Sequence, residues 1–572
     1  MPQKTSHDPF PGIYEASNSA EKRREESADR RAGKFSKLIR AYAPYAVLIV
    51  AVLLAYSNVY HNEFLHDDPV LIRDNKFLTS WHYIGTLFVT HTAQGHDSHD
   101  PFYRPLMTLL YLFIYQTAGP STLAFHLLNV TLHALNACLL YTLGVRLGFR
   151  RIGTFLAALL WALHPVQTEA VTYMSGTAEP LCGMLFLLDI LVLTGDFSRR
   201  NILLACILFV LALLTKETAV VFPLLAMGLL FYRSENRWSF KTYLKTWPFW
   251  LLVVLYLVAR STVLNFNGFF GYYDTALTAD ITIWDRFCSF LATLPTYLRL
   301  LIWPTGLHFM RYFPLYRSLW MPQVMAGLVI LAAAFTNIVW KPSRRATPLA
   351  WGILWAAAVH IPASGILVLN DAVITEHWLY LPMMGLSLGL GESLAQMSGH
   401  VGTLRFRPVL AGSAVLIAGL SGVMTFEQNK VWRDRITFDT HIIDCGEDTA
   451  RTRTNLGTAY GEKGELTQAI RQFRLALALD NNYELAHFNL GAALINDAQT
   501  SYMLKITAAP PDLSSPGFSE GLEHVQRAFE LNPDDYRACD ALAYVYAHLG
   551  DQTKALEYQA KAAAIRKKLG ID

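Results

Sequence analysis

Long apolar segments recur through most of this chain and constrain its fold more than any other feature. Between residues 41 and 425, apolar runs of about 15 to 25 residues alternate with polar or basic turns. Backbone groups cannot stay unpaired in hydrocarbon, so such segments cross a membrane as helices. Hydrophobic residues make up 53% of the 572 residues and charged residues 16%, which excludes an ordinary soluble protein. The sequence therefore predicts a polytopic helical protein in a lipid bilayer.

The distribution of Lys and Arg predicts how these segments are oriented, because basic residues in short loops stay in the cytoplasm. Threading the chain between the basic clusters gives about eleven spans, with twelve as the alternative. An odd number puts the N-terminus inside and the C-terminus outside. The expected spans are 41-60, 121-145, 152-165, 180-195, 201-215, 218-232, 246-264, 320-340, 348-369, 377-396 and 406-425. The stretches 105-118 and 285-303 are short or charged, and we expect interfacial or re-entrant helices there, on the outer face.

The two ends of the chain differ from this membrane region. Residues 1-40 are polar and mixed in charge, which predicts a disordered cytoplasmic tail. The membrane domain is expected over 41-425, with a long outer loop at 61-120. A linker over 426-450 then leads to a repeat domain over 451-572. The predicted fold class is all-α, a multi-span membrane domain followed by a short α-solenoid.

The C-terminal region repeats with a helical period. Asn455-Leu456-Gly457 recurs 34 residues later as Asn489-Leu490-Gly491, and a third unit runs from Ala541 to Tyr558. This is the spacing of tetratricopeptide repeats, in which small residues lie where paired helices touch. The stretch from Thr500 to Ser519 interrupts the period and is expected to be a loop. Such arrays bind extended polypeptides, so we expect a polypeptide partner.

Two adjacent carboxylates, Asp67 and Asp68, directly follow the first apolar segment. Like charges at the mouth of a membrane helix are costly to desolvate, so we interpret them as a catalytic centre. The structural alternative is that they cap or solvate the loop, as an Asp-Asp-Pro sequence does. Catalysis is favoured because the predicted topology puts other polar residues on the same outer face. These are Arg104, His164, Glu169, Lys216, Glu217, Arg260, His308, Arg311, Glu376 and His377.

Each of these residues also has a structural interpretation of its own. Lys216 and Glu217 fit a solvated turn, and Arg260 fits an anchor at the membrane interface. His164 fits a helix stop, and His377 fits a satisfied buried polar group. Within segment 121-145, four polar residues share one helical face, which predicts helix–helix hydrogen bonds. They are His126, Asn129, His133 and Asn136.

As a set, these motifs resemble those of the transmembrane and tetratricopeptide-repeat O-mannosyltransferases, in the glycosyltransferase class C superfamily. The resemblance covers most of the membrane region in family order, and the repeats follow. The matching pieces are Phe64-Leu65-His66-Asp67-Asp68, Tyr103-Arg104-Pro105-Leu106, Leu163-His164-Pro165-Val166-Gln167-Thr168-Glu169, Thr215-Lys216-Glu217-Thr218, Ala259-Arg260-Ser261, Trp303-Pro304 and Trp378-Leu379-Tyr380-Leu381-Pro382. Two departures are His66, where the family usually has Trp, and Gly176-Thr177-Ala178-Glu179, where the family usually has Gly-Arg-x-Glu. The short repeat array resembles that of a bacterial relative.

The resemblance implies an inverting transfer of a sugar, with mannose as the candidate, from a polyprenyl phosphate to a hydroxyl acceptor. Asp67 is then expected to take the acceptor proton, and Asp68 to orient the acceptor or tune Asp67. Arg104 and Arg260 are expected to bind the donor phosphate, because guanidinium groups suit oxyanions. The other residues are expected to line the donor pocket: His164, Glu169, Lys216, Glu217, His308, Arg311, Glu376 and His377.

Three functions stay open on the sequence. The first is transfer to Ser or Thr of an exported protein presented by the repeats. The second is transfer to a glycolipid or cell-surface polysaccharide, and the third is a non-enzymatic membrane scaffold. No cluster has metal-ligand spacing and no basic, aromatic-interleaved patch occurs, so we expect neither a metal cofactor nor a nucleic-acid partner. We expect a bacterial inner membrane with catalytic loops and repeats in the periplasm, or the lumenal face of the endoplasmic reticulum in a eukaryote.

The predicted topology can be tested with a phosphatase reporter that is active only outside the cytoplasm. A fusion after Asp572 should be active, because an odd number of spans puts the C-terminus outside. A fusion after Glu235, in a loop that carries Arg233 and Arg237, should be inactive. If the C-terminal fusion were inactive while a fusion within loop 61-120 was active, the span count would be wrong.

Overall fold

The computed structural model describes most of the chain. The described residues are 41–96, 102–262, 281–309, 311, 313–339, 346–366, 374–400, 406–495 and 516–569. The predicted tail at 1-40 lies outside them. Within the described ranges the regular structure is helical and contains no strand, so the all-α prediction is confirmed.

A helical bundle occupies the region predicted to lie in the membrane, and a helix lies in each of the expected spans. Its helices are Ala41–Ala55, α3 (Pro105–Ala118), α4 (Thr122–Arg146), α5 (Arg151–Leu163), α7 (Ala178–Leu193), α8 (Arg199–Leu213), α9 (Phe222–Arg233), α11 (Trp247–Thr262), α13 (Ile283–Ile302), α14 (Pro322–Val339), α15 (Pro348–His360), α16 (Tyr380–His400) and α17 (Phe406–Asn429). The stretches expected to be interfacial or re-entrant form α3 and α13.

Hydropathy and helix length support a membrane protein. In the described part of the chain, four helical segments are long and apolar enough to cross a bilayer, and several others, among them Arg151–Leu163, are apolar but shorter. The four are Thr122–Arg146, Met174–Leu193, Phe240–Thr262 and Pro322–Val339. The total number of spans stays a prediction.

Buried polar side chains form hydrogen bonds between the helices of the bundle. His133 of α4 contacts the Tyr380 hydroxyl of α16 at 3.0 Å and the Ala162 carbonyl of α5 at 2.9 Å. Asn136 donates to the Pro180 carbonyl of α7 at 2.7 Å and to the Tyr380 hydroxyl at 3.0 Å. The predicted helix–helix hydrogen bonds are therefore confirmed for these two residues.

Glycines let helices α15 and α16 approach closely. A Cβ atom on Gly352 would lie 2.5 Å from the Gly385 carbonyl oxygen, and one on Gly389 would lie 2.6 Å from the Pro348 carbonyl oxygen. These neighbours are backbone atoms, which cannot move aside as a flexible side chain can. These glycines therefore allow the short distance between α15 and α16.

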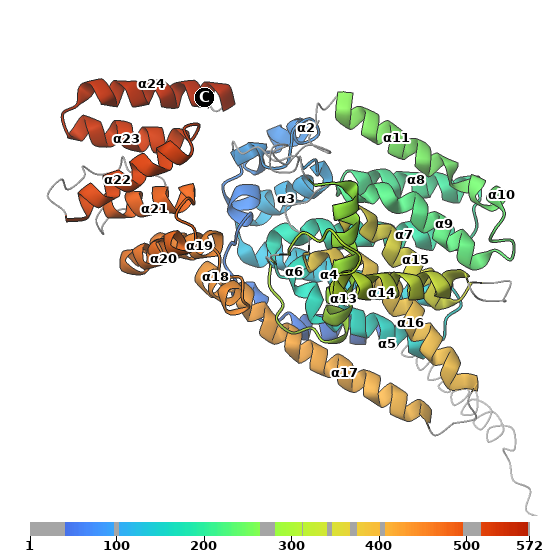
Figure 1. Cartoon of the computed structure of the whole chain (residues 1–572). Coiled ribbons are helices and arrows are strands. Elements are labelled where there is room, and N and C mark those ends of the chain that lie inside the picture. Colours follow the sequence, from blue (N-terminus) through green and yellow to red (C-terminus); the bar gives the residue numbers. More distant parts are fainter. Residues whose placement is uncertain are drawn as a thin grey trace, which may run out of the picture.

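The C-terminal region forms three helix pairs that stand to one side of the bundle (Figure 1). The pairs are α19 (Ala450–Glu462) with α20 (Leu466–Leu479), α21 (Glu484–Ile495) with α22 (Pro516–Leu531), and α23 (Tyr536–His548) with α24 (Gln552–Leu569). Residues 500–515 of the predicted loop lie outside the described residues, and the prediction is wrong at its end, because Pro516 to Ser519 form the first turn of α22. Proline is favoured in a first turn, where its missing N–H is not needed.

The predicted linker is largely helical. Helix α17 runs along the edge of the bundle and leads through a short turn into α18 (Arg435–Asp444), which packs on α19 (Figure 1). Asn429, at the end of α17, donates to the Ala55 carbonyl at 2.9 Å and accepts from the Thr172 hydroxyl at 2.7 Å. The linker therefore begins at a point tied to two other segments of the membrane domain.

The close approach of α15 and α16 predicts a position-specific response to a single added methyl group. Gly352→Ala should lower stability by about 1 to 3 kcal/mol, because the Cβ atom would force two backbones apart. Gly228→Ala in α9 should be neutral or stabilising, since nothing lies within 4 Å of its added Cβ and Ala is the better helix former. Thermal unfolding in detergent would measure both, and equal effects would contradict the packing argument.

Candidate active site

The two adjacent carboxylates have different surroundings. Asp68 is buried, and its Oδ1 accepts from the Ser175 N–H at 2.8 Å and from the Ser175 hydroxyl at 2.6 Å. Its Oδ2 accepts from the Leu65 N–H at 2.9 Å. The Asp67 side chain is exposed, while its backbone N–H donates to the Tyr173 hydroxyl at 3.0 Å. Asp68 thus holds the loop, and Asp67 offers an accessible carboxylate.

Electrostatics also separate the two carboxylates. Desolvation by the surrounding protein raises the pKa of Asp67, although the Tyr173 hydroxyl and the charges of Arg104 and Arg451 act in the opposite direction. Burial raises the pKa of Asp68 to about 7, against the hydrogen bonds from Ser175 and Leu65. A carboxylate with a raised pKa is a better proton acceptor than an ordinary surface Asp.

A cluster of charged residues, here called the basic cluster, lies at the start of α7 and the ends of α8 and α11. Its centre is Glu217, which accepts from the Tyr103 N–H at 2.8 Å and from the Arg104 Nε at 3.2 Å. Arg260 of α11 approaches the same carboxylate, with Nη1 3.9 Å from Oε1. Burial alone would raise the pKa of Glu217, but Arg104 and Arg260 outweigh burial and hold it below its ordinary value.

Lys216 completes the basic cluster through an ion pair with Glu179 of α7. Burial lowers the pKa of Lys216 to about 7 and Arg104 adds to this effect, while Glu217 and Glu169 oppose it. Three cationic side chains therefore face two carboxylates in one buried region. The guanidinium groups of Arg104 and Arg260 suit an anionic group such as a phosphate.

A second cluster joins three distant segments. Glu169 accepts from the backbone N–H groups of Glu376 at 2.8 Å and His377 at 3.0 Å, and it also contacts the His377 ring. Glu376 in turn accepts from the His308 N–H at 2.8 Å and from Arg311 at 2.7 Å. Burial raises the pKa of Glu376 to about 8, Glu169 adds to the rise, and Arg311 opposes it. The two clusters adjoin, because the charge of Glu169 reaches Lys216.

His164 lies apart from these charges. Its Nδ1 accepts from the Val166 N–H at 3.3 Å, and its Nε2 lies 3.2 Å from the Leu301 carbonyl. The ring therefore caps the short helix η6 (Pro165–Gln167), which fits the structural alternative of a helix stop. The other predicted residues belong to the two clusters or to the loop that carries Asp67.

The site contains residues that sequence reasoning missed. Tyr173 and Ser175 hold the Asp67 loop, and nothing in their spacing marked them. Glu179 was not predicted as a site residue, although it had one signal, its place in the Gly176-Thr177-Ala178-Glu179 motif. Asp439, which lies beside His66 at 3.9 Å, comes from the linker and had none. Among described residues, no group of three or more His, Cys, Asp or Glu side chains is placed to hold a metal ion.

Comparison with known proteins gives two results. Family models described as TPR repeat and tetratricopeptide repeat match residues 455–496 and 537–569. Across 506 residues the chain is 26% identical to the protein O-mannosyl-transferase TMTC3 of Mus musculus, covering 81% of this chain and 54% of that protein. It is 24% identical to Tmtc3 of Drosophila melanogaster, covering 86% of this chain and 60% of that protein. This chain is a homologue of the TMTC protein O-mannosyltransferases.

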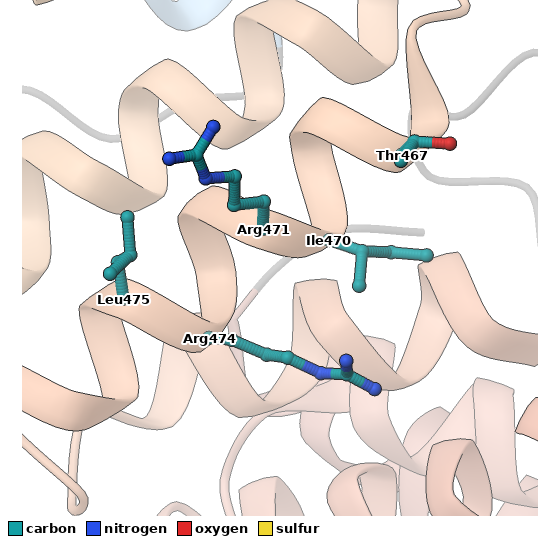
Figure 2. Close-up of a pocket in the computed structure, with 5 residues that line it drawn as sticks. All are labelled: Thr467, Ile470, Arg471, Arg474 and Leu475. Carbon is teal, nitrogen blue, oxygen red and sulfur yellow. The ribbon is translucent and has the colours of Figure 1, made fainter.

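The homology covers most of this chain, but this chain spans little more than half the length of the TMTC relatives that it matches. The repeat prediction is confirmed by the family models and by the three helix pairs. Helix α20 of the first repeat carries a hollow lined by Thr467, Ile470, Arg471, Arg474 and Leu475 (Figure 2). The residues of the two charge clusters do not line this hollow.

The basic cluster predicts a strong stability effect from a single uncharged substitution. Glu217→Gln should destabilise the protein by about 3 kcal/mol, because Arg104 and Arg260 would lose the carboxylate that balances them. Since the pKa of Glu217 lies below its ordinary value, this stabilisation is present at neutral pH and is lost as the pH falls through the lowered pKa. Thermal unfolding at several pH values would measure it.

A matched control is Glu427→Gln. That carboxylate pairs with Lys430 at 2.7 Å, but the side chains are 59% and 56% exposed, and such surface pairs contribute about 1 kcal/mol or less. If both substitutions had the same small effect, the buried pairing would not stabilise the loops.

Proposed function

We propose that the protein is a membrane glycosyltransferase that moves a sugar, with mannose as the candidate, from a polyprenyl phosphate to a Ser or Thr hydroxyl. The observation that carries the proposal is an exposed Asp67 carboxylate that feels the charge of Arg104, a member of a buried cluster rich in cations. The TMTC homologues are named protein O-mannosyl-transferases, which supports the same chemistry.

Asp67 acts as the general base. The acceptor hydroxyl gives its proton to the Asp67 carboxylate while its oxygen forms a bond to the anomeric carbon. The bond from that carbon to the donor phosphate oxygen breaks on the opposite face, and the electron pair leaves with the phosphate. The anomeric configuration is therefore inverted. Asp68 has both oxygens engaged by Leu65 and Ser175, so its role is to position the loop.

The leaving phosphate gains negative charge as the bond breaks. Arg104, Lys216 and Arg260 are placed to stabilise this charge, because they lie together in a region with little water. Glu217 orients both guanidinium groups before the donor arrives. Glu169, Glu376, His377, His308 and Arg311 are proposed to contact the sugar. The lipid tail would stay in the bilayer, because these residues follow helix ends.

The repeats are proposed to present the acceptor polypeptide. Arg451 of α19 is close enough for its charge to lower the pKa of Asp67. The first repeat helix therefore begins near the base, where a bound polypeptide would need to be delivered. We propose that this face lies in the periplasm of a bacterium or in the lumen of the endoplasmic reticulum.

The test is sugar transfer in proteoliposomes that contain polyprenyl-phosphate-linked radiolabelled mannose and a lysate of exported proteins. Wild-type protein should label protein, and Asp67→Asn should lower the rate at least 100-fold, because the amide cannot accept the proton. The matched control is Asp74→Asn, an exposed carboxylate of the same loop that pairs with Arg73 and should not affect the rate. The acid limb of the wild-type profile should lie above the ordinary Asp pKa of about 3.9, because the pKa of Asp67 is raised.

Other outcomes would identify other functions. Label that moves to lipid or glycan would replace the protein acceptor with a glycolipid or polysaccharide. No transfer from any polyprenyl-phosphate sugar, with capture of a polypeptide by the repeats retained, would leave a membrane scaffold.

A further inference from the structure

His66, directly before Asp67, has an unusual backbone. Its φ of 46° makes it the one described residue other than glycine with a positive φ. That region is unfavourable for side chains with a Cβ atom and persists where surrounding contacts impose it. The backbone that carries Asp67 is therefore held in a shape that it would not adopt alone.

Two contacts of the His66 ring come from outside its own loop. The ring stacks on Phe309 at a centroid distance of 5.2 Å and meets Phe438 edge to face at 4.9 Å. Phe438 belongs to α18, the helix between membrane domain and repeats. Phe438, Leu65, Tyr173, Trp432 and Ile442 form one buried apolar cluster. The linker helix therefore forms part of the wall around the base.

Helix α18 also brings a carboxylate to this ring. Asp439 is fully buried, and neither of its oxygens has a hydrogen bond. Oδ1 lies 3.9 Å from the His66 Nε2, which likewise has no hydrogen bond. A shift of about 1 Å would bring these atoms to hydrogen-bond distance. Two unsatisfied buried polar groups facing each other are costly, and such costs are retained mainly at functional sites.

Burial and nearby charges shift the pKa values of Asp439 and His66 in opposite directions. Burial raises the pKa of Asp439 to about 7, Arg435 opposes the rise, and Glu462 adds to it. Burial lowers the pKa of His66 to about 3, with Arg435 and Arg451 adding to the effect. Below about pH 7 the carboxyl group therefore holds a proton, which it can donate to the neutral imidazole.

We propose that His66 and Asp439 form a positioning pair, in which the linker helix holds the ring and thereby sets the place of the Asp67 carboxylate. The pair closes to a hydrogen bond from the Asp439 carboxyl to the His66 Nε2 when substrate occupies the site. This inference rests on the proposed transferase function. It makes α18, which packs on the first repeat helix, a mechanical connection between acceptor binding and the base.

The pair can be distinguished from a structural contact by its opposite effects on stability and rate. Asp439→Leu removes a buried carboxyl group without a partner, so the thermal midpoint should stay the same or rise. The same variant should lower kcat by about 10- to 100-fold, because a misplaced base loses reactive geometry. KM for the acceptor should change little, since neither residue contacts it.

Asp439→Asn is the rescue variant, because its amide N–H can still donate to the His66 Nε2. Its kcat should stay within about threefold of wild type, the range expected when one hydrogen bond is kept in altered geometry. Asp444→Leu is the matched control, an exposed carboxylate near the end of the same helix, and it should leave kcat unchanged. His66→Phe keeps the aromatic stacking, and its effect in combination with Asp439→Leu should not be additive if both act through one contact.

The outcomes separate the inference from the function on which it rests. Transfer by wild type with unchanged kcat in Asp439→Leu would overturn the positioning pair and leave the transferase intact. A loss of kcat and thermal midpoint together in both Asp439 variants would make Asp439 a structural residue and overturn the pair as well. Wild-type protein that transfers no sugar would overturn the proposed function, and the inference with it.

Discussion

Buried charge at the helix ends is the constraint on which the rest of the site depends. A carboxylate withdrawn from water must be matched by cations or N–H groups, because an unpaired buried charge is far more costly than any single contact is favourable. Glu217 meets this requirement with Tyr103, Arg104 and Arg260, and Glu169 meets it with Glu376 and His377. Each match joins segments that are distant in sequence, so satisfying the charges also fixes the loops. Among the predicted site carboxylates, Asp67 is the exposed one.

The linker between the bundle and the repeats also contacts the loop that carries Asp67. Asn429 ends α17 with hydrogen bonds to two segments, and the Glu63 N–H donates to the Arg433 carbonyl at 2.8 Å. The path from the last bundle helix to the repeats therefore passes along the loop that carries Asp67. Helix α18 is packed through Phe438 and Ile442 against that loop. A repeat domain attached in this way cannot move without disturbing the wall of the proposed catalytic site.

The sequence predicted the helices well and the site in part. Apolar runs of membrane length give helices because the backbone has no other partner in hydrocarbon, and the 34-residue period in 451-572 gives helix pairs. The sequence predicted that Arg104, Lys216, Glu217 and Arg260 share one face with six other polar residues, and the structure brings these four into one cluster. His164 shared that face but caps a helix, because the predicted side of a membrane says nothing of which way a ring points.

By itself, the sequence determined that this chain forms membrane helices followed by repeats, because hydropathy and period depend on the order of residues along the chain. It also determined which chemical groups were available, since carboxylates and guanidinium groups keep their properties in any fold. Tertiary structure decided that the Asp67 carboxylate is exposed and that the Asp68 carboxylate is buried in hydrogen bonds with the loop. The sequence alone does not distinguish these two neighbours. Tertiary structure also decided that Asp439 faces His66, because contacts between residues hundreds of positions apart arise only when helices pack.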